Sequence, residues 1–235
     1  MLHTETVEKR TLDLIKKLMA DSQFSAFNLV GGTALALHLG HRKSIDIDLF
    51  TIADFNAPLL TDHITATYDP KQLRTITNGI FGFIDGIKID LIAHQYPLLA
   101  EPDIIDDIRI ISLQDIAAMK LNAIFDNGTR LKDFVDIYAL LETLSLQQMV
   151  NACGQKYPDL NTSMVKNALL YHDDIDLTVP IDYIGIDIKW PSIKERLQNA
   201  FHNPKITFGK LPDKTVELMK KVHRKQPRKG KRPRL

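Results

Sequence analysis

Residues 30–50 read VGGTALALHLGHRKSIDIDLF, and their pattern predicts the first elements of the fold. The short apolar run before Gly31–Gly32 predicts a strand that ends in a turn. TALALHLG contains good helix formers and stops at Gly40, as helices commonly do at glycine. SIDIDLF, at 44–50, alternates apolar and polar residues, which is typical of a half-buried strand. We therefore expect a strand, a glycine turn, a short helix and a second strand, in that order.

The two faces of the predicted strand 44–50 differ in chemistry. Alternation puts Ile45, Ile47 and Leu49 on the buried face and Ser44, Asp46 and Asp48 on the open face. Two acids two residues apart on a strand lie about 7 Å from each other. A third acid, Asp90, lies in IKIDLIAH, which follows a strong hairpin signal at Asp85–Gly86. The sequence thus predicts three carboxylates on strands of one sheet.

These features together point to phosphoryl chemistry. Three clustered carboxylates repel one another unless cations are bound, and Mg²⁺, or Mn²⁺ in its place, takes oxygen ligands and leaves positions for substrate phosphates. Two such ions can clamp the attacking and leaving oxygens of a displacement. Glycines at a strand-to-helix turn let the backbone approach a triphosphate, and Thr33 adds a hydroxyl. A Gly-Gly pair alone is usually a turn, and an Asp-x-Asp pair alone is usually a solvated face, so the prediction depends on their combination.

The rest of the chain predicts an α+β protein in which a mixed sheet flanked by helices precedes a helical part. Before residue 111 we expect helices at 5–20 and 57–67 and strands at 73–78, 79–84 and 87–94. From the capping-box-like start at Ser112 we expect helices that begin near residues 112, 130, 146, 161 and 191. Residues 172–190 stay unassigned. The predicted domains are 1–111, the catalytic core; 112–219, a helical domain that contributes to the site; and 220–235, a basic disordered tail.

Charge is distributed unevenly along the 235 residues. The chain has 30 Lys and Arg against 29 Asp and Glu, but residues 220–235 hold nine of the basic residues and no acid, which leaves 21 against 29 elsewhere. Such a tail is typical of RNA or DNA binding through phosphates, or is only a solvated extension. One cysteine, Cys153, excludes an internal disulfide and suits the cytoplasm. We see no export signal and no membrane span.

Residues 30–50 resemble the first motif of the DNA polymerase β-type nucleotidyltransferase superfamily: Gly-Gly, 13 residues, then Asp-hydrophobic-Asp-hydrophobic. Together with DIAAMKLNAI and KDFVDIYALL, the stretches GGTALAL and HRKSIDIDLF resemble the AbiEii/AbiGii toxin family of nucleotidyltransferases. The resemblance covers roughly residues 25–145. It implies Mg²⁺-dependent transfer of a nucleoside monophosphate from an NTP to an acceptor, RNA such as tRNA or protein. It also implies a toxin of a bacterial toxin–antitoxin or phage-defence system, with a cognate antitoxin as partner.

Site roles follow from this resemblance position by position. Asp46, Asp48 and Asp90 match the metal-binding and catalytic carboxylates, and Gly31, Gly32 and Thr33 match the phosphate loop. Ser44, Lys120, Asp133 and Asp136 match further site residues of the family, and the sequence does not rank Asp133 against Asp136. Arg42 and Lys43 either meet phosphate or belong to a solvated loop.

The residues leave structural alternatives open. Lys120 is otherwise an exposed helix charge, and Asp133 or Asp136 otherwise pairs with Arg130 or Lys132. At the level of the whole protein, the alternative function is a module that binds nucleic acid or a partner on a nucleotidyltransferase fold without catalysis. The sequence does not identify the NTP or the acceptor.

Overall fold

The computed structural model describes residues 1–185 and 187–209. The first part comprises the 3₁₀ helices η1 (Thr4–Thr6) and η2 (Ser22–Phe24) and α1 (Lys9–Ala20), β1 (Asn28–Val30), α2 (Gly31–Leu39), β2 (Ile47–Thr51), α3 (Ala57–Tyr68), β3 (Lys71–Ile76), β4 (Gly79–Ile84), β5 (Ile87–Ala93), β6 (Asp103–Ile105) and β7 (Ile108–Ile110). The helices α4 (Leu113–Asp126), α5 (Leu131–Leu140), α6 (Leu146–Lys156), α7 (Thr162–Ala168) and α8 (Trp190–His202) follow. The predicted basic tail, 220–235, lies outside the described residues.

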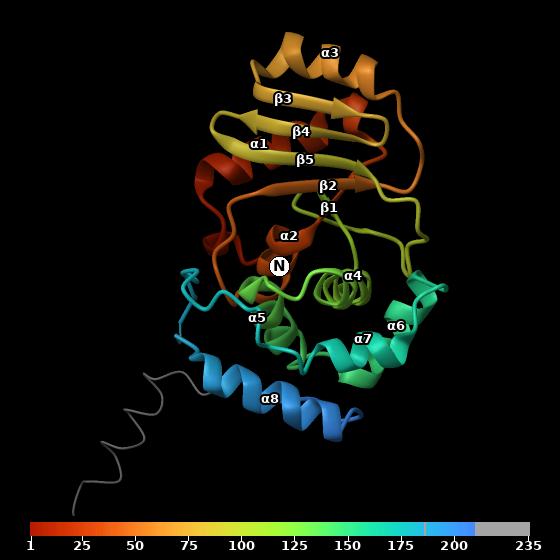
Figure 1. Ribbon diagram of the computed structural model, residues 1–235. Helices are drawn as coiled ribbons and strands as arrows, with labels where there is room; N and C mark the ends of the chain where they lie inside the picture. The colour runs from red at the N-terminus through yellow and green to blue at the C-terminus, as the bar shows by residue number, and fades with distance from the viewer. Residues whose placement is uncertain (186, 210–235) are drawn as a thin grey trace, which may run out of the picture.

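The strands form one mixed sheet in the order β3-β4-β5-β2-β1-β7-β6 (Figure 1). β2 and β5 run parallel, as do β1 and β7, and the other neighbours are antiparallel. The predicted Asp85–Gly86 hairpin is present, and both residues have positive φ. The parallel β2–β5 pair is what brings the acids of two sequence-distant segments side by side.

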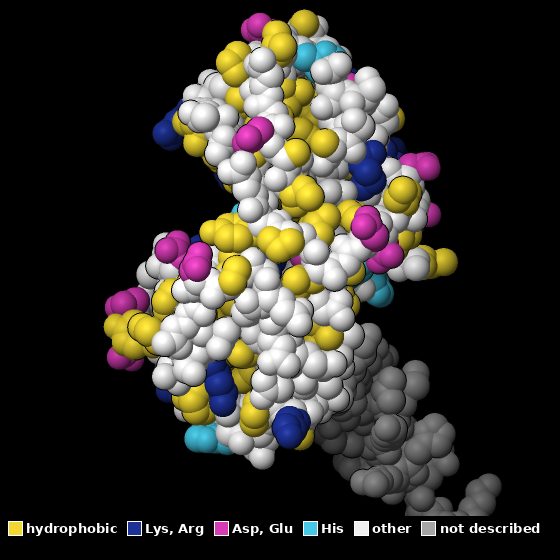
Figure 2. Space-filling model, turned by 90° about the vertical axis from the view of Figure 1, so that its right-hand side faces the viewer, with side chains coloured by type: hydrophobic (Ala, Val, Ile, Leu, Met, Phe, Trp, Pro, Cys, Tyr) yellow, Lys and Arg dark blue, Asp and Glu magenta, His cyan; other side chains and the backbone are white. Residues whose placement is uncertain are grey.

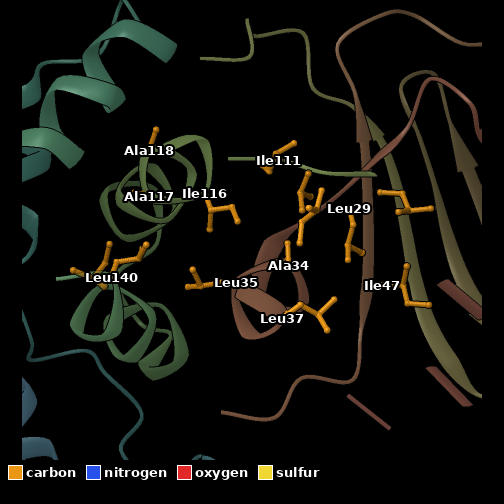
Figure 3. Close-up of a cluster of buried hydrophobic side chains, with 14 of the residues drawn as sticks. Leu29, Ala34, Leu35, Leu37, Ile47, Ile111, Ile116, Ala117, Ala118 and Leu140 are labelled. Carbon is orange, nitrogen blue, oxygen red and sulfur yellow. The ribbon is translucent and has the colours of Figure 1, made fainter. Parts of the chain in front are cut away.

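The helix α2 lies at the centre of the molecule. Residues 32–37 are all buried, because this helix packs against the sheet on one side and against the helical part on the other. Figure 3 shows Leu35 and Leu37 of α2 between Leu29 and Ile47 of the strands and Leu140 of α5. One hydrophobic cluster therefore contains residues from both sides of position 111. The predicted domain boundary there stays a prediction.

The fold class predicted from the sequence is confirmed, since a mixed sheet flanked by helices is followed by helices alone. The helix α4 begins as expected, because the Ser112 side chain accepts a hydrogen bond from the backbone N–H of Asp115 at 3.1 Å. Viewed from the right of Figure 1, the molecule narrows between its sheet and helical parts, and hydrophobic side chains gather there (Figure 2). Among the described residues, no helix is long and apolar enough to cross a membrane.

The strand predicted at 44–50 is shorter than expected. β2 begins at Ile47, and Ile45, assigned to the buried face, is 57% exposed. The reason is that residues 43–46 make their hydrogen bonds outside the sheet: Lys43 N–H donates to the Asp182 carbonyl, Ser44 N–H to the Thr6 carbonyl, and the Thr33 hydroxyl to the Asp46 carbonyl. Asp46 therefore precedes the strand. The distance of about 7 Å between Asp46 and Asp48, which assumed that both lie on one strand, does not apply.

Candidate active site

Two acids lie side by side at the centre of the site. Asp48 of β2 and Asp90 of β5 are register partners on adjacent parallel strands, so their side chains emerge on the same face, from backbones about 4.8 Å apart. Burial, and then the charge of Asp90, raise the pKa of Asp48 to about 6. The pair is thus under electrostatic strain that a bound cation would relieve.

Asp90 is only partly satisfied by protein groups. Its Oδ2 accepts a hydrogen bond from the Lys88 ammonium, whereas its buried Oδ1 has no hydrogen-bond partner among the described residues. Buried polar atoms are normally paired, so an orphaned carboxylate oxygen beside a second carboxylate suits an external ligand. The chemistry of these oxygens fits a hard divalent cation.

The glycine turn makes room for side chains of the site. Gly31 has φ +71°, and a Cβ there would clash with Asp48 Oδ2. A Cβ at Gly32 would lie 2.7 Å from Arg42 Nη2. The two glycines therefore allow the backbone at the start of α2 to approach the Asp48 carboxylate and the Arg42 guanidinium. The expectation that they also cradle a triphosphate stays a prediction.

Thr33 holds the segment that leads into β2. Its buried hydroxyl donates to the Asp46 carbonyl and lies 2.9 Å from Ser44 Oγ. These contacts explain why a threonine follows the two glycines: it anchors the backbone of the acidic segment to the first turn of α2. Ser44 and Asp46 themselves are half-buried and face a pocket.

A buried ion network lies beneath the turn. Lys120 Nζ of α4 lies 2.6 Å from Asp133 Oδ1 and 2.7 Å from Asp136 Oδ2 of α5. Arg42 donates to both oxygens of Asp136, at 2.7 and 2.9 Å, and His41 Nε2 lies 2.9 Å from Asp136 Oδ1. Burial alone would raise the pKa of Asp136, but Lys120 and Arg42 hold it well below its usual range. The Arg42 guanidinium is therefore buried and paired with Asp136. Of the two environments expected for Arg42, the solvated loop is thus wrong.

A pocket of about 240 Å³ opens beside these groups. Its lining includes the cationic side chains of Lys43, Arg130 and Lys132, here called the cationic wall, together with Arg42 and Lys120 of the ion network and the acidic Asp46 and Asp48. The segment Pro180–Asp182, which the sequence left unassigned, forms another wall. It is fastened to the chain before β2, because Lys43 Nζ lies 3.3 Å from Asp182 Oδ2 and Arg42 bridges to Tyr183.

Comparison with protein families identifies the family of the chain that forms this site. A model described as "Nucleotidyl transferase AbiEii toxin, Type IV TA system" matches residues 13–90 and 81–183, well over half of the chain. The chain belongs to the AbiEii family. AbiEii proteins are nucleotidyltransferases, so the resemblance seen in the sequence is confirmed, and nucleotidyl transfer is the general activity that membership supports.

Individual relatives of this AbiEii chain add little about function. An uncharacterized protein of Aquifex aeolicus, aq_aa25, is 29% identical over 195 residues, which cover 80% of this chain and 93% of that protein. A presumed nucleotidyltransferase from H. pylori is 17% identical with a TM-score of 0.49, over 90% of this chain and 98% of its own. JHP933 from Helicobacter pylori is 15% identical with a TM-score of 0.45, over 92% and 99%. These structural likenesses are too distant to inform the site.

The structure brings together most of the site residues predicted from the sequence. Seven line the pocket: Gly32, Arg42, Lys43, Ser44, Asp46, Asp48 and Lys120. Gly31, Thr33, Asp90, Asp133 and Asp136 lie directly behind or beside these residues. Their roles as ligands or catalysts stay predictions. Among the described residues, no three His, Cys, Asp or Glu side chains form a ready-made metal cluster.

Sequence reasoning missed the contributions of distant segments. Thr6 and Glu8 near the start of the chain and residues 180–182 line the pocket, and His41 joins the ion network. Of the pocket residues outside the predicted set, only Lys132 had a signal in the sequence, because it directly precedes Asp133 in the α5 motif KDFVDIY. Trp190 packs edge-on against Phe134 and His172. Cys153 is buried, and burial raises the pKa of its thiol to about 11.

Proposed function

We propose that this chain transfers a nucleoside monophosphate from an NTP to an acceptor hydroxyl with the help of Mg²⁺, and that this activity makes it the toxin of a type IV toxin–antitoxin system. The observation that carries the proposal is the in-register pair Asp48–Asp90 beside a pocket whose lining holds five cationic side chains. Membership of the AbiEii family supports both the reaction class and the toxin role.

Asp48, Asp90 and the neighbouring Asp46 are the residues that would hold Mg²⁺. When bound, the ion would offset charge on the reacting phosphate. The raised pKa of Asp48 and the unpartnered Oδ1 of Asp90 support this assignment. Lys88 already neutralises one oxygen of Asp90. The free Oδ1 is thus the atom through which Asp90 would act.

The cationic wall would bind the triphosphate. Lys43, Arg130 and Lys132 are at least partly exposed and offer ammonium and guanidinium donors to phosphate oxygens. Lys120 is paired with Asp133 and Asp136, so these two carboxylates already offset its charge. We therefore assign the phosphate contacts to the other three cations. The wall would therefore hold the β- and γ-phosphates and leave the α-phosphate near the carboxylates.

In the transfer step, an acceptor hydroxyl oxygen attacks the α-phosphorus. A new oxygen–phosphorus bond forms, the bond from the α-phosphorus to the bridging oxygen of the β-phosphate breaks, and pyrophosphate leaves. The hydroxyl proton passes to a carboxylate oxygen of Asp90. A general base of this kind contributes about 10²–10⁴-fold to the rate.

The experiment is to incubate the purified full-length chain with Mg²⁺, each α-labelled NTP in turn, and total RNA together with cell protein. We expect transfer of label to one acceptor class from one or more NTPs. Asp48→Asn should abolish the transfer, whereas Asp62→Asn, the same change at an exposed position of α3, should leave it intact. Absence of transfer with every NTP, in a chain that still binds nucleotide, contradicts the proposal.

The toxin role has a separate test. Induced expression of the chain in a bacterial host should arrest growth, and the arrest should be relieved by Asp48→Asn but not by Asp62→Asn. Growth that is unaffected by an active enzyme would remove the toxin role and leave the transfer reaction in place.

A further inference from the structure

A row of register partners extends beyond the two acids across four strands. Asp48 of β2 pairs with Asp90 of β5, Asp90 with Phe81 of β4, and Phe81 with Arg74 of β3. Register partners on neighbouring strands point to the same face and lie about 4.8 Å apart between strands. An aromatic ring and a guanidinium therefore continue the row of carboxylates, on the side of Asp90 away from β2.

Within residues 1–185 and 187–209, the hydrophobic core does not cover this face of β3, β4 and β5. The opposite face carries the buried Ile80 and Ile84 and meets α3, where the hydroxyls of Thr61 and Thr75 lie 2.8 Å apart. Figure 1 shows α1 crossing behind β4 and β5, with none of the labelled helices in front of them. Phe81 is only half-buried and belongs neither to the core cluster nor to the side chains packed against it.

Gly79 sets the position of the Phe81 ring. A Cβ at Gly79 would lie 2.9 Å from both Cε2 and Cζ of Phe81, and 3.3 Å from Cγ1 of Ile76. The ring therefore lies across the strand over the glycine backbone, with the half-exposed Ile76 at its edge. A ring supported from below in this way is a preformed stacking surface, which extends from the Asp90 row of the sheet towards Gly79 and its register partner Ile92.

Resting on the nucleotidyl transfer proposed above, we propose that Phe81 and Arg74 bind the acceptor, and that the acceptor is the end of a single-stranded nucleic acid. Its last base stacks on Phe81, and a phosphate of the strand meets Arg74. Stacking aromatics beside cations are typical of single-strand binding. Arg74 is exposed and, within the described ranges, is engaged in no ion pair, so its guanidinium is available to phosphate.

The two sides of the carboxylate pair then serve the two reactants. The cationic pocket lies on the side of Asp48 where Lys120 and residues 180–182 are found, and its lining includes neither Phe81 nor Arg74. An acceptor strand on the Phe81 side does not compete with the triphosphate for that pocket. Its terminal hydroxyl would reach Asp90, which stands between the two regions. A duplex would not bind in the same way because its bases are already stacked.

The test is direct binding, measured without NTP so that it does not depend on transfer. The probe is a fluorescein-labelled single-stranded RNA of about eight nucleotides, within the usual site size. Phe81→Leu should weaken its binding about 5-fold to 150-fold, the value of one base stack. Gly79→Ala should weaken binding several-fold by displacing the intact ring, and Phe81→Trp should retain binding. All variants carry the same basic tail, so its contribution cancels.

The matched control is Phe83→Leu, because Phe83 is half-buried two residues further along β4, opposite Lys88. The affinity of Phe83→Leu for the RNA probe should stay within about twofold of the wild type. The affinity of every variant for NTP should also stay within about twofold. The proposal is overturned if the wild type does not bind the probe, if Phe81→Leu and Gly79→Ala bind it normally, or if label goes only to protein. If Phe81→Leu fails to fold, the comparison of the other two variants decides: RNA binding should be weakened in Gly79→Ala and retained in Phe81→Trp. Loss of RNA binding on Phe81→Leu in a chain without transferase activity would support the platform and contradict only the proposed reaction.

Discussion

The substitution Asp48→Asn should stabilise the metal-free protein while it removes activity. Asp48 is held next to Asp90 with a pKa of about 6, above the ordinary value of 3.8. A raised carboxyl pKa means that the folded protein resists ionisation of this group. The contribution of Asp48 to stability is therefore fully present below pH 3.8 and is lost as the pH rises through about 6. Asparagine keeps the shape and never ionises.

The size of the effect follows from the shift. About two pH units at 1.36 kcal/mol each correspond to an upper limit of about 3 kcal/mol in the free energy of unfolding. Asp48 retains some access to solvent, so we expect about 1–2 kcal/mol in favour of Asp48→Asn at pH 7.5 and near equality at pH 4. Saturating Mg²⁺ should reverse the order, because a ligand that binds only the folded wild type adds about 2.7 kcal/mol at 100 times its Kd.

Urea unfolding of both proteins at pH 4, 5, 6 and 7.5, in EDTA and then in Mg²⁺, measures these differences. Asp62→Asn serves as the control for the loss of one carboxylate, because Asp62 is exposed on α3. The reasoning is refuted if the difference between wild type and Asp48→Asn does not grow with pH. It is refuted equally if Mg²⁺ stabilises both proteins alike.

Other substitutions test the supports of the site. Gly31→Ala should abolish transfer and destabilise the fold by at least about 1 kcal/mol, because its Cβ would meet Asp48 Oδ2 and its φ is +71°; activity assays and urea unfolding would show whether it behaves as wild type instead. Arg42→Lys should cost about 1.5–3 kcal/mol in unfolding free energy, since one ammonium cannot replace the bidentate contact with Asp136, and an unchanged urea midpoint would contradict this. Cys153 should react with a thiol reagent only when urea unfolds the protein, and fast labelling of the native chain would show that the thiol is accessible.

Local chemistry explains what could be predicted from the sequence. The turn at Gly31, the stop at Gly40 and the cap at Ser112 depend on residues within one turn of helix, and all three are present. The hairpin at Asp85–Gly86 is equally local. By contrast, β6 and β7 were not predicted, because each has three residues and their turn contains Asp106 and Asp107, both with positive φ. Short strands of that kind are formed by pairing with the sheet rather than by their own pattern.

The residues of the site could be predicted from the sequence, but the contacts between them could not. Arg42 and Asp136 are 94 positions apart, and nothing in either segment indicates that they form a bidentate pair. The sequence offered only local partners for Asp136, whereas burial against α2 and α4 selects Arg42 and Lys120. The start of β2 shows the same effect: alternation favours a strand from residue 44, but contacts with Thr6 and Asp182 take that backbone out of the sheet.

Charge balance links these distant contacts to the proposed chemistry. Within the buried network, Arg42 and Lys120 offset Asp133 and Asp136, so the network as a whole adds little net charge to the site. What remains at the pocket is a carboxylate pair with one oxygen unpartnered among the described residues, together with the exposed Lys43 and Arg130 and the half-buried Lys132. An NTP with its divalent cation has the complementary pattern, since the proposed cation would meet the carboxylates and the phosphates would meet the cationic wall. Removing one network partner should therefore disturb folding first, whereas removing Lys132 should weaken nucleotide binding with little change in stability.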